Sequence, residues 1–470
     1  MCDDDDARDR VKLYRHYHMT SQLTLGEMIE MTETYVMSLT VPQILIILFV
    51  LYMSVPSGLL GFGRPTIPRR EERVNETTRR RHITKLRATS KLFPPPYPNG
   101  WYRICLSSDV KKGEVIPITA FGQELVVFRG QNGKLGVLNA FCPHLGTHLG
   151  HGGTVNGNAI VSPYHSWSFE ADGKCVGIPH CKRDLTKMQR RLSAKPFVHR
   201  EIHGIVFVWY HADGGEKLQK PWYELSILRE IKERNMKLVG DFTMEPWHMH
   251  IMEPAQNSTD WYHFLTVHKW LGSKHDSRCK FLAVQHECKT HMRLLGKQNR
   301  LQARPVLLPD GVCDKGSTKE AEMLPSTWIC LEENVTRASL FGVIPIPGVF
   351  FRHFTAEARF QGPQVSVFAV ESSWFGAVHM IFSFTPKKPF LQKASMRAFR
   401  TGWFPQWMAV AIARHGMNTI EQDRAVWENK LTIAPRNLVA GDGPFAAFGT
   451  WIKQFYSEKS VNWGDLSLEW

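Results

Sequence analysis

The hydrophobic pattern divides the chain into one long apolar segment near the N-terminus and a body in which strand-like and helix-like periodicities alternate. Residues 34–63 contain no charged side chain. Their apolar core is about 20 residues long, which is enough to cross the hydrocarbon layer of a bilayer. From Val115 onward, short segments rich in β-branched residues are separated by turn sequences. We therefore predict a transmembrane anchor over 34–63 and a mainly β region after it.

Alternation of apolar and polar residues predicts strands in five places, and helical periodicity predicts one long helix. The predicted strands are Val115–Ala120, Glu124–Arg129, Leu135–Leu138, Val365–Glu371 and Ala377–Phe384, and the predicted helix is Trp407–Lys430. An Asn132-Gly133-Lys134 turn joins the second strand to the third.

The charges beside the apolar segment predict its orientation. The N-terminal tail, 1–33, holds eight acidic and four basic residues, whereas the linker, 64–92, holds ten basic and three acidic ones. Because positive loops stay in the cytosol, the body should be cytosolic, on a single-pass membrane protein that we expect in the endoplasmic reticulum. A signal peptide is the alternative, but the segment starts far from the N-terminus and no cleavage site follows it.

Composition narrows the class of protein. A chain of 470 residues, 43% of them hydrophobic, is long enough for several folded domains. The net charge of +14 arises largely in the basic linker, and no nucleic-acid recognition motif accompanies it, so no nucleic-acid role is expected. The nine cysteines are scattered, which favours a reducing compartment over a disulfide scaffold.

A pair of histidines in the middle of the chain suggests a metal site. Asp260 precedes His263 by three residues, so on one helix the two share a face, whereas His268 needs a bend or a helix end to converge with them. Two histidines and a remote carboxylate form the facial triad of non-haem Fe(II) oxygenases. The alternative is that these two imidazoles are only hydrogen-bonded within the fold. We expect that structural role for His248 and His250 just upstream, which match no ligand position.

A second cluster of ligand-type residues lies upstream. Cys142-Pro-His144 is followed by Ser162-Pro-Tyr-His165, with several glycines between. A Rieske [2Fe-2S] centre uses two cysteines on one iron and two histidines on the other, in the form C-x-H and C-x-x-H. The pattern predicts such a centre, with one ligand position changed.

The changed position is Ser162. A serine alkoxide is a harder and more basic ligand than a thiolate. Three interpretations stay open: Ser162 ligates and gives a more labile cluster of lower potential, the cluster is lost, or Cys175 or Cys181 supplies the thiolate.

At this point the chain resembles the Rieske-type oxygenases, and specifically the Neverland family of cholesterol 7-desaturases, with bacterial 3-ketosteroid hydroxylases as more distant relatives. The resemblance spans roughly residues 90–457. The motifs that carry it are Pro94-Pro-Pro-Tyr-Pro-Asn-Gly-Trp101, Cys142-x-His144, His165-x-Trp167, Asn257-x-x-Asp260-x-x-His263-x-x-x-x-His268, Glu421-x-Asp423, Trp427-Glu-Asn-Lys430, Gly441-Asp-Gly443, Trp451 and Gln454-Phe-Tyr456. The chain departs from the family at Ser162 and at Gln256, where a glutamate usually stands.

The resemblance implies an α+β architecture in two folded domains. A Rieske domain would occupy 93–215, and a helix-grip catalytic domain, an antiparallel sheet wrapped on a long C-terminal helix, would occupy 216–457. A short tail, 458–470, would follow.

The resemblance also implies a ligand set and an electron path. His263, His268 and Asp423 would hold the mononuclear iron, with Glu421 as the alternative carboxylate. Asp260 would bridge a cluster histidine to an iron histidine, across subunits of a head-to-tail homotrimer. Electrons from NAD(P)H would come through a separate reductase, because the chain has no Gly-x-Gly-x-x-Gly fingerprint of its own.

The implied activity is the O2-dependent conversion of cholesterol to 7-dehydrocholesterol, with the anchor drawing the sterol from the membrane. The apolar run Phe341–Phe351 is a candidate lining for the sterol pocket. Two alternatives remain: a steroid hydroxylase of the same family, or a sterol-binding paralogue that Ser162 has left impaired or without activity.

Overall fold

The structure is a computed structural model, and it divides into two compact units, Met1–Pro56 and Ser57–Trp470. All described residues belong to the second unit; they are 94–182, 189–214, 220–244, 246–260, 262–268, 270–271, 282–289, 327–340, 344–346, 354–430, 437–439, 442, 445–464 and 466. The predicted tail, anchor and basic linker, and most of Phe341–Phe351, lie outside them. Within the described ranges no helix has both the length and the apolar character needed to span a bilayer.

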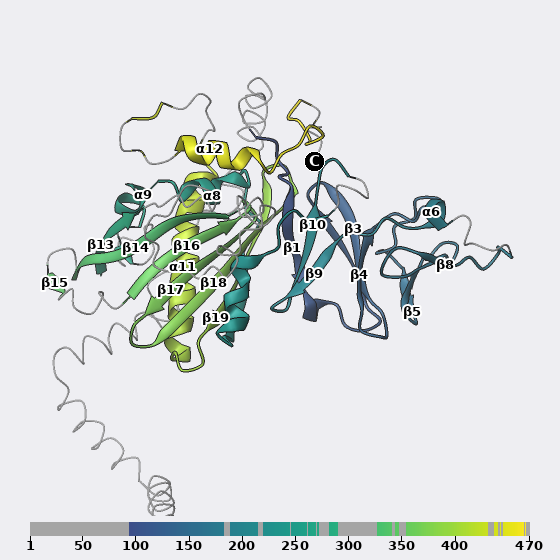
Figure 1. Ribbon diagram of the computed structural model, residues 1–470, viewed down its shortest axis with the longest axis horizontal. Helices are drawn as coiled ribbons and strands as arrows, with labels where there is room; N and C mark the ends of the chain where they lie inside the picture. Colours follow the sequence, from purple (N-terminus) through teal and green to yellow (C-terminus); the bar gives the residue numbers. More distant parts are fainter. Residues whose placement is uncertain are drawn as a thin grey trace, which may run out of the picture. The chain divides into compact units, whose positions relative to one another are not determined.

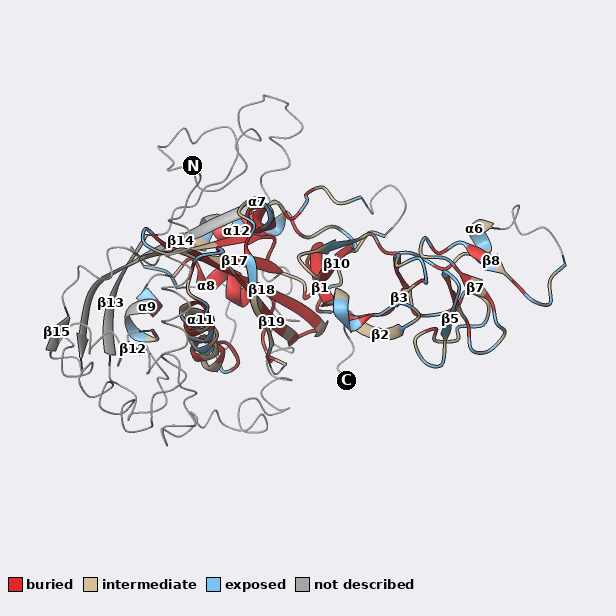
Figure 2. Cartoon of the chain, turned by 90° about the horizontal axis from the view of Figure 1, so that it is seen from below, coloured by how far each residue is buried: buried red, intermediate tan, exposed pale blue. Residues whose placement is uncertain are grey.

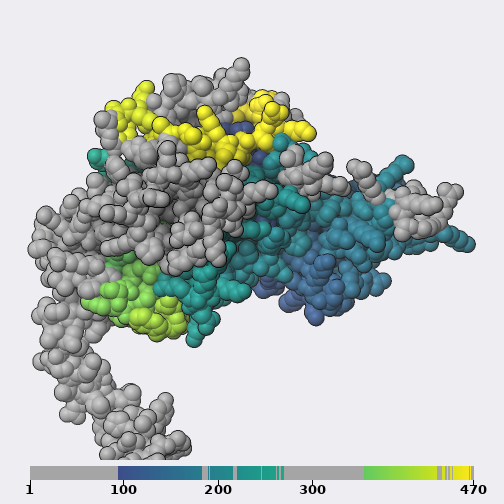
Figure 3. All heavy atoms as spheres, viewed as in Figure 1, coloured from purple at the N-terminus to yellow at the C-terminus, as the bar shows by residue number. Residues whose placement is uncertain are grey.

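The N-terminal part of the described chain is built from three small antiparallel sheets. Their orders are β1-β10-β9, β2-β3-β4 and β5-β6-β7-β8. The strands are β1 (Gly100–Leu106), β2 (Val115–Ala120), β3 (Gln123–Arg129), β4 (Leu135–Asn139), β5 (Thr154–Asn156), β6 (Ala159–Val161), β7 (Ser168–Phe169), β8 (Cys175–Gly177), β9 (His199–Ile202) and β10 (Ile205–Tyr210), with the short helices η1 (Ser107–Asp109) and α6 (Gln189–Leu192) between them. The three strands predicted here are confirmed. Figure 3 shows this part of the chain in blue to teal.

Strand β3 explains why this part folds as a stack of layers. Leu125 and Val127 belong to one buried cluster, whereas Val126 and Phe128 belong to another. Because successive side chains of a strand point to opposite faces, a continuous apolar run buries both faces of β3. The second cluster also contains Cys142, so the predicted cluster loops rest on this core.

The C-terminal part is organised around one large antiparallel sheet. Its order is β11-β19-β18-β17-β16-β14-β13-β12, with β15 paired to β14. The strands are β11 (Lys237–Thr243), β12 (Trp270–Leu271), β13 (Leu282–Lys289), β14 (Thr327–Leu340), β15 (Ile344–Ile346), β16 (Phe354–Gln361), β17 (Val365–Ser372), β18 (Gly376–Lys388) and β19 (Leu391–Arg400). The two strands predicted in this region are confirmed.

Helix α11 (Gln406–Trp427) lies against strands β11, β18 and β19 (Figure 1). It confirms the predicted long helix, although it ends at Trp427 rather than at Lys430. The remaining helices are η3 (Ser226–Leu228), α7 (Arg229–Glu233), α8 (Met252–Asn257), α9 (Tyr262–Thr266) and α12 (Phe445–Lys453).

The sheet separates two cores. Met380 and Phe382 of β18 share a buried cluster with Ala409 and Ala413 of α11, whereas Ile381 belongs to the cluster on the other face. Gly416 also lets the helix approach the sheet closely, because a Cβ added there would lie 2.9 Å from the Met380 sulfur. Figure 2 shows buried residues concentrated along β17, β18 and β19. The described residues thus have the predicted α+β architecture, a β-rich first part followed by an antiparallel sheet with a long helix.

The two parts meet in a partly buried ion pair. Arg103 of β1 donates to both carboxylate oxygens of Asp241 in β11, each at 2.9 Å, and Arg397 of β19 reaches the same carboxylate at 3.2 Å. The predicted boundary at 215 stays a prediction, because 215–219 lie outside the described residues.

Candidate metal centres

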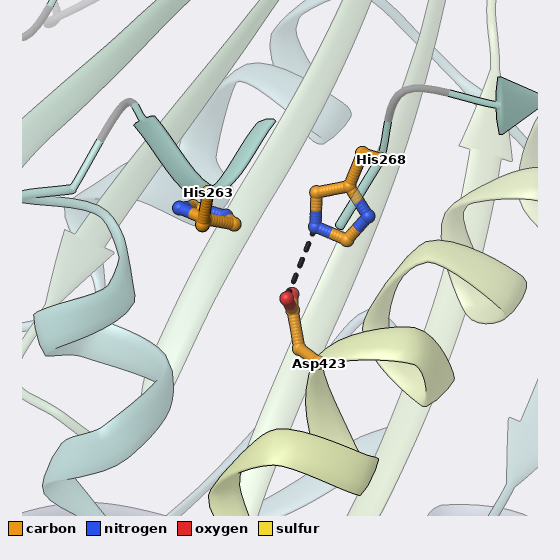
Figure 4. A group of neighbouring side chains, drawn as sticks. All are labelled: His263, His268 and Asp423. Carbon is orange, nitrogen blue, oxygen red and sulfur yellow. Dashed lines mark ion pairs between the residues drawn. The ribbon is translucent and has the colours of Figure 1, made fainter. Parts of the chain in front are cut away.

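Three of the predicted iron ligands converge in the C-terminal part. His263 lies on α9, His268 follows the end of that helix, and Asp423 lies near the end of α11 (Figure 4). One ligand atom from each residue lies within 4.8 Å of the other two. The predicted helix end between His263 and His268 is therefore present, and it is what turns both rings toward Asp423.

The partners of His268 leave one ring nitrogen directed at the carboxylate. Nδ1 donates to the Gln422 side-chain oxygen at 2.9 Å, and Nε2 lies 3.0 Å from Oδ1 of Asp423. With its proton on Nδ1, the ring places a lone pair opposite the lone pairs of a buried carboxylate. A cation between the two removes this repulsion, so the donor set fits a divalent metal.

His263 is held in the matching orientation. Its Nδ1 donates to the main-chain carbonyl of Asp260, and its Nε2 accepts a hydrogen bond from the Asn257 amide at 3.0 Å. Burial lowers the pKa of His263, which the neighbouring Asp423 carboxylate partly offsets. The ring is thereby kept neutral, as a metal ligand must be.

Asp260 does not share a helix face with His263, and that prediction is wrong. Helix α8 ends at Asn257 and α9 begins at Tyr262, so Asp260 precedes the second helix. Its Oδ1 accepts the N–H groups of Tyr262 at 2.9 Å and His263 at 3.3 Å. An aspartate at this position caps the free N–H groups of the first turn. Within the chain, Asp260 orients the His263 ring through its carbonyl rather than its carboxylate.

The sequence analysis did not identify two residues that position the iron-site histidines. Gln422, the residue before Asp423, accepts from Nδ1 of His268 and so fixes the tautomer of that ring. Asn257 contacts the His263 ring. Glu421, the alternative ligand, accepts from Arg424 at 3.3 Å instead. The helical spacing of the sequence holds no signal for Gln422, because its partner lies 154 residues away.

A second compact group of ligand-type residues lies elsewhere on the sheet. It consists of Glu230, Glu371 and His379. Arg234 donates to both carboxylates, at 2.8 Å and 2.6 Å, and Arg359 donates to Glu230 at 3.1 Å. Two guanidinium groups neutralise these carboxylates, so this group is an ion-pair network rather than a metal site.

The predicted cluster ligands also come together, at the tips of two loops. The rings of His144 and His165 have centroids 4.6 Å apart, and Cys142 and Ser162 are both buried. Nδ1 of His144 is buried and has no hydrogen-bond partner among the described residues. Burial and the neighbouring His165 and His180 lower the pKa of His144. A neutral imidazole with a buried, unpaired nitrogen fits a metal ligand.

The two cysteines named as alternatives to Ser162 pack in or against the same buried cluster as Cys142. Cys175 is fully buried in β8, and burial raises the pKa of its thiol, with the nearby Cys142 adding to the rise. Cys181 follows β8 and is half-buried. Three of the four cluster ligands therefore match the Rieske pattern, and Ser162 occupies the fourth place.

Comparisons with known proteins match both parts of the described chain. Residues 100–196 match the Rieske [2Fe-2S] domain family, and residues 395–456 match the 3-ketosteroid 9alpha-hydroxylase C-terminal domain family. Among solved structures, dicamba monooxygenase bound to dicamba shares the fold, with a TM-score of 0.51 and 14% identity over 76% of this chain and 97% of that one. The Rieske match and this fold support a [2Fe-2S] cluster and non-haem iron as cofactors, with electrons supplied by a separate reductase.

Two curated relatives cover most of the chain. Cholesterol 7-desaturase nvd 2 of Ciona intestinalis is 31% identical over 394 residues, which is 83% of this chain and 77% of the relative. Cholesterol 7-desaturase nvd of Drosophila melanogaster is 29% identical over 375 residues, 78% of this chain and 77% of the relative. Identity of this extent, together with the converging ligands, shows that the chain is an oxidoreductase and belongs to the Neverland family of Rieske-type oxygenases.

Proposed function

We propose that the protein is a sterol desaturase that removes the hydrogens from carbons 7 and 8 of cholesterol, using O2 and electrons from NAD(P)H. The convergence of His263, His268 and Asp423 within 4.8 Å carries the proposal. The relatives named cholesterol 7-desaturase supply the substrate class.

The chain's own residues prepare the metal position. Gln422 keeps the proton of His268 on Nδ1, and the Asp260 carbonyl does the same for His263, so that both Nε2 atoms are unprotonated. Nε2 of His263 accepts a hydrogen bond from the Asn257 amide, which a bound metal would displace. Asp423 adds the single negative charge. When bound, Fe(II) supplies the activation of O2 at its open positions. Burial of all three side chains keeps water from this position.

Exposed apolar side chains beside the two cluster loops support docking of another protein there. Phe141, Leu145, Tyr164 and Val176 flank the cluster loops and are exposed, Leu145 and Tyr164 to 66% each. Exposed apolar side chains gathered in one place are typical of interaction surfaces. We propose that this end receives electrons from the reductase and meets a neighbouring subunit of a homotrimer, where Asp260 would link the two metal centres.

The proposed attachment to the membrane is based on the amino-acid sequence. The apolar segment 34–63 and the basic linker 64–92 would tether the body to the cytosolic side of the endoplasmic reticulum. A sterol dissolves poorly in water, so a tethered site would draw it directly from the lipid.

A steroid hydroxylase is the second candidate. The match over 395–456 to the 3-ketosteroid 9alpha-hydroxylase C-terminal domain family favours it, because this range includes α11 and Asp423. A probable 3-ketosteroid-9-alpha-monooxygenase of Rhodococcus rhodochrous is also 26% identical over 77% of the chain. The two reactions differ in how the sterol lies over the metal.

Sterol analysis by mass spectrometry tests the proposal. Cells that make no 7-dehydrocholesterol are supplied with cholesterol and express the full chain or His263→Ala. We expect a product two hydrogens lighter than cholesterol from the wild type and none from the variant. A product heavier by one oxygen would favour the hydroxylase. No product from a wild-type protein that holds both metal centres would contradict both, and would favour a sterol-binding paralogue.

A further inference from the structure

We infer that Ser162 is the fourth ligand of the [2Fe-2S] cluster and binds iron through its side-chain oxygen. The inference rests on the Rieske site described above and deepens the proposed function, because it makes the cluster a one-thiolate centre. It chooses among the three interpretations that the sequence left open.

The two cluster loops repeat the same hydrogen-bond pattern. The N–H of Cys142 donates to the carbonyl of Thr147, five residues later in the chain, at 2.8 Å. The N–H of Ser162 donates to the carbonyl of Trp167, also five residues later, at 2.8 Å. The return bonds also match: Gly146 N–H donates to Cys142 at 3.0 Å, and Ser166 N–H donates to Ser162 at 3.1 Å. Ser162 therefore holds in the second loop the place that Cys142 holds in the first.

The second loop keeps this shape although its sequence is less suited to it. Gly146 and Ser166 occupy the corresponding fifth positions, with φ of +74° and +56°. Glycine adopts a positive φ without strain, whereas serine rarely does. Strained backbone of this kind clusters at ligand-binding sites, where the surrounding structure enforces it.

The side chains between the loops are arranged as for a bound cluster. Ser162 is 3% exposed and Cys142 is 4% exposed, so both face inward. The Trp167 indole of the second loop stacks on His144 of the first, with centroids 4.5 Å apart and planes 8° from parallel. This stacking fixes the ring whose Nδ1 is buried without a partner among the described residues.

The arrangement of these ligands is compatible with a two-iron cluster. In the part of the chain that the structure describes, groups of three ligand atoms within 4.8 Å of one another occur at two places. Neither place includes Cys142, His144 or His165. A single ion needs such a compact group, whereas a two-iron cluster holds cysteine and histidine on different irons.

The two nearby cysteines belong to strand β8 and the segment after it, not to the cluster loops. Cys175 pairs with Phe169 across the β7–β8 ladder, and its sulfur lies 3.9 Å from the Gly177 carbonyl. Cys181 lies beyond the end of β8, where its N–H donates to Ile178. Recruiting Cys175 to the cluster would cost the contact of its sulfur with the Gly177 carbonyl.

The proposed ligation changes the cluster without changing its electron count. As the iron–oxygen bond forms, the serine hydroxyl gives up its proton to solvent, and no oxidation or reduction accompanies the step. An alkoxide is a harder donor than a thiolate and favours the ferric state. The cluster should therefore be harder to reduce than one with a second thiolate.

The test measures cluster content and potential rather than sterol turnover. Acid-labile sulfide, iron, the EPR spectrum and the reduction potential are compared in the full chain carrying Asp423→Ala, so that iron counts report the cluster alone. Into this background we place Ser162→Cys, Ser162→Ala and Cys175→Ser.

We expect cluster in the parent protein and in Cys175→Ser, and loss of more than about nine-tenths of the sulfide in Ser162→Ala. Ser162→Cys should raise the reduction equilibrium constant at least tenfold, which is about 59 mV for a one-electron couple. Circular dichroism checks that each variant is folded, and Ser162→Cys carries the test if Ser162→Ala does not fold.

Several results would overturn the inference. Equal sulfide and equal potential in the parent and Ser162→Ala would show that Ser162 is not a ligand. Loss of the cluster in Cys175→Ser would assign the fourth place to Cys175. A parent without sulfide, whether or not Ser162→Cys regains it, would mean that serine does not support a cluster. A parent that holds the cluster while the wild type fails to convert sterol would reject the proposed function and leave this inference standing.

Discussion

The two metal centres of this chain are built in opposite ways. The cluster ligands come from two loops between β4 and β7, and each loop is closed by its own main-chain hydrogen bonds. The candidate iron ligands come from α9, from the turn after it and from α11, and the bond between His268 and Gln422 joins residues 154 positions apart. One site is thus shaped locally, whereas the other exists only when the whole sheet has folded.

The histidines of the two centres also differ in how far they are buried. His144 and His165 are half-buried at the tips of their loops, whereas His263 and His268 are buried, at 8% and 5% exposure. A centre that exchanges electrons with a partner protein needs an accessible edge. A centre that activates O2 benefits from exclusion of water. The difference suggests that mutations should separate the two centres cleanly.

The largest expected effect is at Asp423. Asp423→Ala removes the carboxylate of the candidate iron site, so we expect complete loss of mononuclear iron and of turnover, with the cluster absorption unchanged. Iron analysis and visible spectroscopy measure the two centres separately. Glu421→Gln is the matched control on the same helix, because Glu421 bonds Arg424 instead. Sterol conversion by Asp423→Ala would reject the assigned ligand set.

A smaller effect is expected at Gln422. Gln422→Leu removes the acceptor that keeps the His268 proton on Nδ1. Loss of such a partner typically weakens metal binding about 10-fold to 100-fold. Competition with a chelator measures the Fe(II) affinity. Gln422→Glu keeps an acceptor and should keep most of the affinity, so a loss as large as that of Gln422→Leu would show that packing, not the hydrogen bond, matters.

The smallest effect concerns a buried histidine outside both centres. His250 donates from Nε2 to the Pro95 carbonyl at 3.2 Å and accepts from the Met252 N–H at 3.1 Å. Burial lowers the pKa of His250 from 6.5 to about 4. The fold therefore favours the neutral ring: the stability it contributes is complete above pH 6.5 and declines as the pH falls from 6.5 toward 4.

Urea unfolding at two pH values measures this contribution. Between pH 7 and pH 5.5 the linkage should remove about 1 kcal/mol from the free energy of unfolding. His250→Gln should lose less over the same interval, because glutamine does not titrate. An identical pH dependence in the two proteins would show that other groups account for the change.

Sequence patterns predicted much of the fold because they report local physics. The five predicted strands and the long helix follow from side-chain alternation and helical periodicity, and each is present near its expected bounds. The break in the stretch 253–268 was harder to place. Asp260 caps the first turn of α9, and a capping aspartate has the same spacing from His263 as one on a shared helix face.

The sequence by itself determined which residues are candidates for the chemistry: the Cys142-x-His144 pattern, the His263 and His268 pair, and the serine in a cysteine's place are all visible in the order of residues. Only the tertiary structure decided how they meet. Asp423 rather than Glu421 faces His268 because the rotation of α11 against the sheet turns that one carboxylate inward. Gln422 and the stacking of Trp167 on His144 likewise join residues from different segments, and such contacts leave no periodic signal in the chain.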